Sequence, residues 1–162
     1  MDLVAWLGFE QTHTPQHVIF LRLVFSALIG AAIGFERGSK TGSAGLRTHM
    51  LIAVAATLFT LLTLEIHAAA VAAGSQGTDP IRAVEAVTAG IAFLGAGAIF
   101  QTRGTVQGLT TAAGMWLAGA TGVSIALGYY IIALGVAVLA IVVLAALRRL
   151  SHDAAADKPD MS

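Results

Sequence analysis

The chain has 162 residues, of which 57% are hydrophobic and only 11% are charged, and its mean hydropathy is +0.82. Soluble domains carry about 25% charged residues, so this composition excludes an ordinary soluble globular domain. Nine Lys and Arg residues balance nine Asp and Glu residues, and the absence of cysteine excludes disulfides, thiolate metal sites and cysteine nucleophiles.

Five apolar segments each have about the 17–25 residues that a helix needs to cross a membrane. The first follows Thr14-Pro15 and the third follows Thr78-Asp79-Pro80, and both sequences are typical of a capped helix start with proline in the first turn. No strand pattern is visible. The predicted spans are Val18–Phe35, Leu46–Leu64, Ala83–Gln101, Leu109–Leu127 and Tyr129–Leu147.

The last two spans lie within Gly104–Leu147, a block of 44 residues that contains no Asp, Glu, Lys, Arg or His. As one helix this block would be about 66 Å long, whereas the apolar core of a bilayer is about 30 Å thick. The block must therefore cross the membrane, turn and cross back. Gly128-Tyr129-Tyr130 is the expected turn, because tyrosine suits the membrane interface.

The positive charges are divided unequally between the two sides of these spans, with seven on the side of the C-terminus and two on the other. Cytoplasmic loops carry the excess of Lys and Arg. We therefore predict an all-α integral membrane protein with five transmembrane helices, its N-terminus outside and its C-terminus cytoplasmic. Residues 1–17 form an outer interfacial segment, residues 18–150 the transmembrane domain and residues 151–162 a short cytoplasmic tail. The seven cations are Arg37, Lys40, Arg47, Arg103, Arg148, Arg149 and Lys158, and the two are Arg22 and Arg82.

Small residues recur at helical spacing along several spans. Gly30 and Gly34 share one face of the first span, and Gly114 and Gly122 share one face of the fourth. Such stripes let helix backbones approach closely where no hydrophobic effect drives association. Packing within the bundle is the first interpretation, and a homodimer or a docked partner helix on the first span is the alternative. The third span contributes Gly90, Gly95 and Gly97.

Arg22 lies about one turn inside the outer edge of the first span, where a charged side chain is costly and indicates a function by default. The first expectation is an ion pair with Glu85 at the outer end of the third span. A role in binding a ligand or ion and simple snorkelling to the interface are the alternatives.

Polar residues gather at the cytoplasmic ends of the first two spans and in the loop before the fourth. One interpretation is a collar that orients the protein and contacts anionic lipids. The other is an anion or phosphate site, because the second and fourth spans both present N-terminal amides at this face. The residues are Glu36, Arg37, Lys40, Arg47, Thr48 and His49, with Arg103 and Gln107 from the loop.

Acidic residues lie at the outer rim. Asp79 most simply caps the third span, but together with Glu65 and Glu85 it is also a candidate for an outer cation site. Magnesium favours one or two carboxylates and keeps several waters. We therefore take Asp79 and Glu85 as the candidate metal ligands, with Mg²⁺ as the ion, and expect no other cofactor.

The spans hold no ionisable group at their middle, and no HExxH, GxSxG or intramembrane Asp pair is present. Proton relays place buried carboxylates or histidines at that depth, and hydrolases show such motifs. We therefore expect neither an enzyme nor a self-contained proton-coupled pump. A path lined by backbone carbonyls stays open as an alternative.

Five short sequences occur in an order and spacing that closely resemble the MgtC/SapB family of bacterial inner-membrane proteins: GAAIGFER, GLRTHM, DPIR, GIAFLGAGAI and GLTTAAGMW. The resemblance covers about residues 20–145. It implies a five-helix inner-membrane domain that takes part in adaptation to low magnesium and, in some members, regulates membrane ATPases. The family positions correspond to Glu36, Arg37, Gly45, Arg47, Thr48, His49, Asp79, Arg82, Gly90, Gly95, Gly97, Gly108, Thr110 and Thr111.

Three functions follow as hypotheses, and none of them involves nucleic acid. The first is a non-enzymatic regulator in the lipid bilayer that acts on membrane proteins, such as a membrane ATPase, through helix contacts and the cytoplasmic collar. The second is a small transporter or channel for magnesium or another ion, with capture at the acidic outer rim. The third is a site for an anion or a lipid headgroup at Arg37, Arg47 and Arg103.

Overall fold

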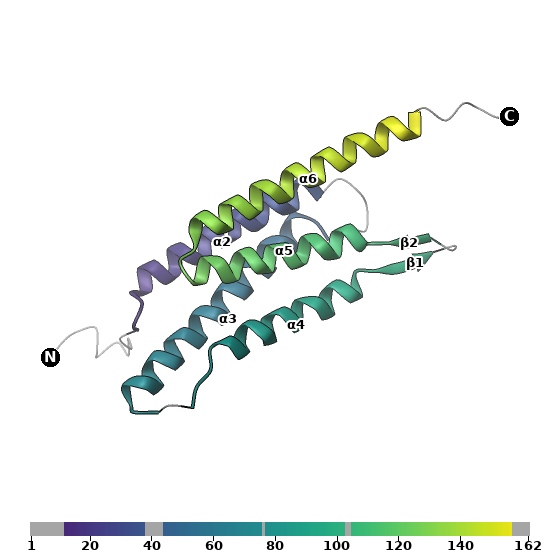
Figure 1. Cartoon of the computed structure of the whole chain (residues 1–162). Helices are drawn as coiled ribbons and strands as arrows, with labels where there is room; N and C mark the ends of the chain where they lie inside the picture. The colour runs from purple at the N-terminus through teal and green to yellow at the C-terminus, as the bar shows by residue number, and fades with distance from the viewer. Residues whose placement is uncertain (1–11, 38–43, 76, 103–104, 157–162) are drawn as a thin grey trace.

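The computed structural model describes residues 12–37, 44–75, 77–102 and 105–156, with side chains for all of these except residues 37, 102 and 147–156. Five helices account for most of this part of the chain, and one short hairpin joins two of them (Figure 1). The elements are α2 (Gln16–Arg37), α3 (Leu46–Ala72), α4 (Ile81–Gly97), β1 (Phe100–Thr102), β2 (Thr105–Gln107), α5 (Leu109–Ala126) and α6 (Tyr130–Ala156).

Three of the helices, α2, α3 and α5, are long and apolar enough to cross a membrane. Tyr130–Ala146 of α6 forms a shorter apolar helix, and α4 has 17 residues. The helical fold class and the membrane-protein class are therefore confirmed. The number of crossings and the sidedness of the two termini stay predictions.

The helices form a bundle in which α3 and α5 lie side by side at the centre. Both α2 and α4 pack on this pair, and α6 packs on α5 and α2. The start of α2 and the connection between α3 and α4 lie at one end of the bundle, whereas the hairpin and the far end of α6 lie at the other (Figure 1). We call these ends the α3–α4 end and the hairpin end.

The hairpin was not predicted, and the expectation of helix up to Gln101 was wrong. Helix α4 ends at Gly97, and β1 pairs antiparallel with β2 so that Phe100 lies opposite Gln107. Aromatic and β-branched residues favour extended backbone, and three-residue strands are too short to show a periodic pattern. Gly108, which joins β2 to α5, has a φ of +88°, a conformation that other residues rarely adopt.

Two helices run further than the hydrophobic pattern indicated. Helix α3 continues past Leu64 to Ala72, where alanine, the best helix former, replaces bulky residues, and it is followed by Gly74 at a φ of +81°. Helix α6 continues to Ala156, into the predicted tail, and residues 157–162 lie outside the described residues. Apolar residues mark where the membrane is crossed, not where the helix stops.

Glycines set the distance between α3 and its two main neighbours. A Cβ atom on Gly30 of α2 would lie 2.6 Å from the carbonyl oxygen of His49 and 2.9 Å from the Cα of Met50. On α5, a Cβ on Gly122 would collide with the carbonyl oxygen of Ala53. Helix α3 therefore covers the glycine face of α2. In the alternative interpretation, a second copy of the chain or a partner helix would have packed on this face.

The glycines of α4 differ from this pattern. Gly95 faces Ala112 of α5 at ordinary contact distance, but neither Gly90 nor Gly97 has any atom within 4 Å of the position that its Cβ would take. The expected packing role of Gly90 and Gly97 is therefore absent from the described part of the chain. Helix α4 is peripheral to the α3–α5 pair, and of its three glycines only Gly95 meets a neighbouring helix.

We predict that Gly30→Val lowers the unfolding temperature of the protein in detergent, because the new side chain meets rigid backbone of α3. Overpacking of this kind costs about 1–3 kcal/mol. Gly135→Val on α6 is the matched control, since no atom lies within 4 Å of its Cβ position. Circular dichroism melting curves measure the difference, and equal unfolding temperatures for the two variants would contradict the close approach of α2 to α3.

Candidate functional site

His49 is the most deeply buried ionisable residue among the described side chains. It lies in the first turn of α3, with 0% of its surface exposed, and its Nδ1 is 2.9 Å from the carbonyl oxygen of Gly45. Because a carbonyl can only accept, Nδ1 carries the proton and donates it to Gly45. This contact orients the ring at the hairpin end of the bundle.

Two glycines on neighbouring helices make room for the His49 ring. A Cβ on Gly34 of α2 would lie 3.0 Å from the Cβ of His49, and a Cβ on Gly114 of α5 would lie 2.8 Å from its Nε2. His49 therefore occupies the junction of α2, α3 and α5. The three residues come from the GAAIGFER, GLRTHM and GLTTAAGMW sequences, so the structure brings three separate motifs together at one buried side chain.

The other predicted site residues at the hairpin end differ in burial: some are packed inside the bundle and others are exposed. Thr111, 2% exposed, lies one turn before Gly114 on α5, and Glu36 and Thr48 are half-buried. Arg47, Gln107 and Thr110 are exposed. Lys40 and Arg103, and the side chain of Arg37, lie outside the described residues.

Glu36 borders an otherwise apolar groove of about 500 Å³ between α2 and α6. Phe35, Leu46 and Ile141 line the same groove. The hairpin end thus combines a carboxylate beside an apolar groove with an imidazole buried between helices. Any change at His49 acts on the packing of three helices together, because the side chain is fully buried where they meet.

At the other end, the expected ion pair between Arg22 and Glu85 was wrong. The Nε of Arg22 donates to the hydroxyl of Tyr130 at 2.9 Å, and its Nη1 donates to the carbonyl oxygen of Ala126 at 2.8 Å. The Arg22 guanidinium also lies 5.9 Å from the centre of the Tyr130 ring. Arg22 therefore binds the end of α5 and the start of α6, whereas Glu85 is exposed on α4.

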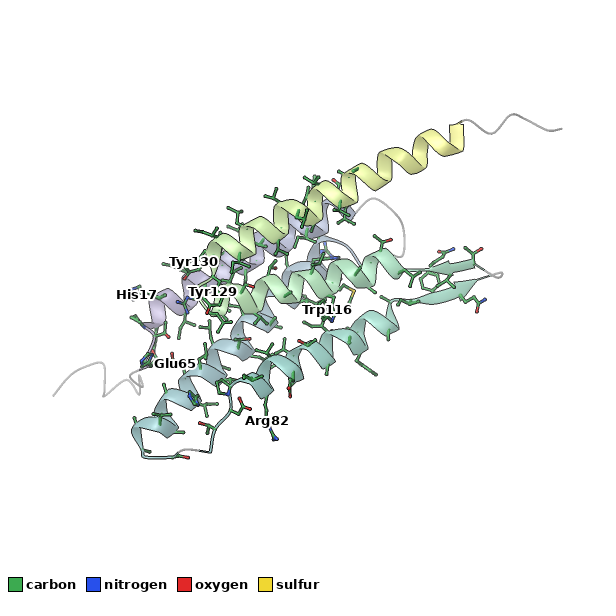
Figure 2. All side chains as sticks on the ribbon, in the orientation of Figure 1. His17, Glu65, Arg82, Trp116, Tyr129 and Tyr130 are labelled. Carbon is green, nitrogen blue, oxygen red and sulfur yellow. The ribbon has the colours of Figure 1, made fainter. Side chains whose placement is uncertain are left out.

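The acidic residues of the predicted outer cation site do not converge. Both carboxylate oxygens of Glu65 on α3 accept main-chain N–H groups from the segment that leads into α2, those of His13 and Thr14. Figure 2 shows Glu65 beside the start of α2. Asp79 accepts from the N–H of Ile81 at 2.9 Å, which is the capping role that we took as its simplest interpretation. Within the described ranges, no group of three or more His, Cys, Asp or Glu residues is placed to hold a metal.

The contacts of three polar residues do not follow from the sequence pattern. The pattern places Tyr130 at the interface and Glu65 on the acidic rim, and it predicts no role for Thr57. The Thr57 hydroxyl lies 2.9 Å from the carbonyl oxygens of both Ala53 and Gly122, so it joins α3 to α5 at the centre of the bundle. The available signal was a threonine in the middle of an apolar span, since hydroxyls commonly bond across helices in membranes.

We predict that Gly114→Ala destabilises the bundle only when His49 is present, because the added methyl meets the sealed ring. The cost should be about 1–3 kcal/mol, and it should largely disappear in the His49→Ala background, where the ring no longer fills that space. A double-mutant cycle on thermal unfolding measures this coupling. If Gly114→Ala lowers the free energy of unfolding equally in both backgrounds, the His49 ring does not limit the side chain at position 114.

We also predict that Tyr130→Phe destabilises the protein less than Arg22→Met does. The phenylalanine keeps the ring, which stands edge-on to Phe25, and removes only the hydroxyl. Loss of one such hydrogen bond costs about 0.5–1.5 kcal/mol. Methionine at position 22 removes the contacts to Tyr130 and to Ala126 together. Equal unfolding temperatures for the two variants would rule out the contact to Ala126 as a stabilising one.

Comparison with known proteins places these observations in a family. Residues 23–153 match the MgtC family. The chain is 35% identical over 131 residues to an Escherichia coli (strain K12) protein named "Putative magnesium transporter YhiD", which covers 81% of this chain and 61% of that protein. It is 41% identical over 96 residues to Protein MgtC of Brucella abortus (strain 2308), covering 59% of this chain and 37% of that protein.

A third relative is Protein SrpB of Synechococcus elongatus, which is 34% identical over 133 residues, or 77% of this chain and 66% of that protein. The chain thus spans about three fifths of YhiD and a smaller share of the Brucella protein. No solved structure matches. The family match covers most of the chain, including all three motifs that meet at His49, and the chain therefore belongs to the MgtC family.

Proposed function

We propose that this protein is a non-enzymatic regulator in magnesium homeostasis that acts through contacts with other membrane proteins in the bacterial inner membrane. In this proposal all five helices cross the membrane, with the N-terminus outside and the hairpin end in the cytoplasm. Membership of the MgtC family and the magnesium-related name of the YhiD relative support the magnesium connection. The family resemblance makes a membrane ATPase the partner class that we favour.

The close packing at the centre of the bundle is the observation that favours a regulator over a transporter. Thr57 joins α3 to α5 there, and Ala53, Ala118 and Ile125 around it are 0% exposed. The hydroxyls of Ser26, Thr60 and Thr121 donate to carbonyls of their own helices. An ion path needs a line of oxygen atoms that face a lumen, whereas these four hydroxyls are bonded to main-chain carbonyls of packed helices.

The hairpin offers the surface for a partner. Its two strands pair only with each other within the described residues, so each outer edge can accept a further strand. Phe100 and Val106, which lie on opposite faces of the hairpin, are each about half exposed. A two-stranded hairpin is marginally stable alone, so a protein that covers this surface would stabilise it. In the proposed orientation the hairpin reaches the cytoplasm beside the headgroups.

We predict that crosslinking at native expression, followed by pull-down of the tagged chain, recovers a membrane protein, and that Phe100→Ser with Val106→Ser abolishes the recovery. The reason is loss of the exposed apolar side chains. Gln107→Ser, which lies opposite Phe100 in the hairpin register, is the control that should keep the partner. A second tagged copy of the chain distinguishes a homodimer from another partner. Recovery of no membrane protein by the unaltered chain would refute the regulator.

A magnesium transporter is the second candidate, and the name of YhiD favours it. Vesicles that hold a magnesium-sensitive dye separate the two proposals. The regulator predicts no magnesium entry above that of vesicles without protein. Entry that is lost on Asp79→Asn or Glu85→Gln would favour the transporter and an outer capture site.

A further inference from the structure

A groove of about 450 Å³ separates α3 from α4 on the side of the bundle. One wall runs from Ile52 to Thr63 on α3, and the other from Ala83 to Leu94 on α4. Half of the α4 residues that line the groove are small, namely Ala83, Ala86 and Gly90. No atom lies within 4 Å of the position that a Cβ on Gly90 would take. The groove exists because these small side chains leave the space between the two helices open.

The lining offers no polar group to a ligand. Its one hydroxyl, that of Thr63, donates to the carbonyl oxygen of Phe59 at 2.9 Å. The other lining side chains are hydrocarbon or glycine, and both helices expose large apolar residues beside the groove, such as Phe59 at 60% and Leu94 at 53%. An occupant of the groove must therefore be a hydrocarbon that reaches it from the membrane.

The length of the groove distinguishes a lipid chain from a protein helix. Each wall advances eleven residues from end to end, which is about 16 Å at about 1.5 Å per residue. The hydrocarbon core is about 30 Å thick, so the groove matches one leaflet. A transmembrane partner helix needs a surface that continues through both leaflets, whereas the acyl chain of a phospholipid needs only one.

A cation stands at the end of the groove where a lipid headgroup would lie. Arg82 directly precedes Ala83, the first residue of the α4 wall, and its side chain is exposed and projects away from the bundle (Figure 2). Guanidinium groups bind phosphate oxygens in pairs. Glu85 is exposed one turn further along α4, and the Asp79 carboxylate accepts from Ile81. Arg82 is thus the cation available to a phosphate at the start of this wall.

We propose that this groove is a phospholipid site, in which one acyl chain lies between α3 and α4 and the phosphate lies against Arg82. The site is distinct from the hairpin surface proposed for a protein partner, and it does not depend on the regulatory function. A lipid held here fills the gap between α4 and α3 and supports the peripheral helix.

The test is photocrosslinking in vesicles of phosphatidylglycerol and phosphatidylethanolamine that contain phosphatidylglycerol with a diazirine on its acyl chain. After illumination and digestion, mass spectrometry measures the label on each peptide. We expect label concentrated on the two walls. Gly90→Leu should reduce it several-fold, because Gly90 lines the groove and a leucine there would occupy the space of the acyl chain, while no atom lies within 4 Å of its Cβ position. Arg82→Gln should also reduce it, through loss of the phosphate contact.

Gly97→Leu is the matched control, because Gly97 is on the same helix and equally open but does not line the groove. It should leave the label unchanged, and the unfolding temperatures of both leucine variants report whether the bundle is intact. Label spread evenly over all lipid-exposed helices, or unchanged by Gly90→Leu in an intact bundle, would overturn the proposal. Disulfide formation between two chains that carry Ala86→Cys on the groove wall, in a sequence that otherwise has no cysteine, would also overturn it and show a protein occupant.

Discussion

The close approach of α3 to α2 and α5 is the constraint on which the rest of the structure depends. In a membrane, lipid tails are as apolar as leucine, so helices associate through contact and hydrogen bonds instead of hydrophobic burial. Gly30 and Gly122 allow that contact on the two sides of α3, and Ala53 lies against both. The Thr57 hydroxyl then reaches the carbonyl of Gly122. A larger residue at either glycine separates the helices that hold every other element in place.

The same constraint explains where polar residues are found. At the hairpin end, the space left by Gly34 and Gly114 holds the ring of His49. At the α3–α4 end, Arg22 and Glu65 bind main-chain atoms of other segments and so tie the ends of the helices together. Charged groups within a membrane domain are costly unless they are bonded. Here they act as structural ties, while the peripheral α4 leaves Gly90 and Gly97 exposed.

Much of the fold could be predicted because hydrophobic length marks membrane crossings. The predicted first and fourth spans agree with α2 and α5 to within two residues at each end. The hairpin could not be predicted, since its strands are shorter than any periodic pattern. The partner of Arg22 could not be predicted either, because Tyr130 is 108 positions away in the chain and only the packed bundle brings the two together. His49 was identified as a polar residue at a helix end, but its burial depends on glycines of two other helices.

The central claim, that the glycine face of α2 packs on α3 of the same molecule, is tested most directly by solid-state NMR in lipid bilayers. The measurement is the carbon–carbon cross-peak between Gly30 and Ala53 in a labelled chain that is diluted with increasing amounts of unlabelled chain. The structure predicts that the cross-peak keeps its intensity per labelled molecule at every dilution. A cross-peak that weakens as unlabelled chain is added would show that Gly30 meets a second copy, and would contradict the bundle described here.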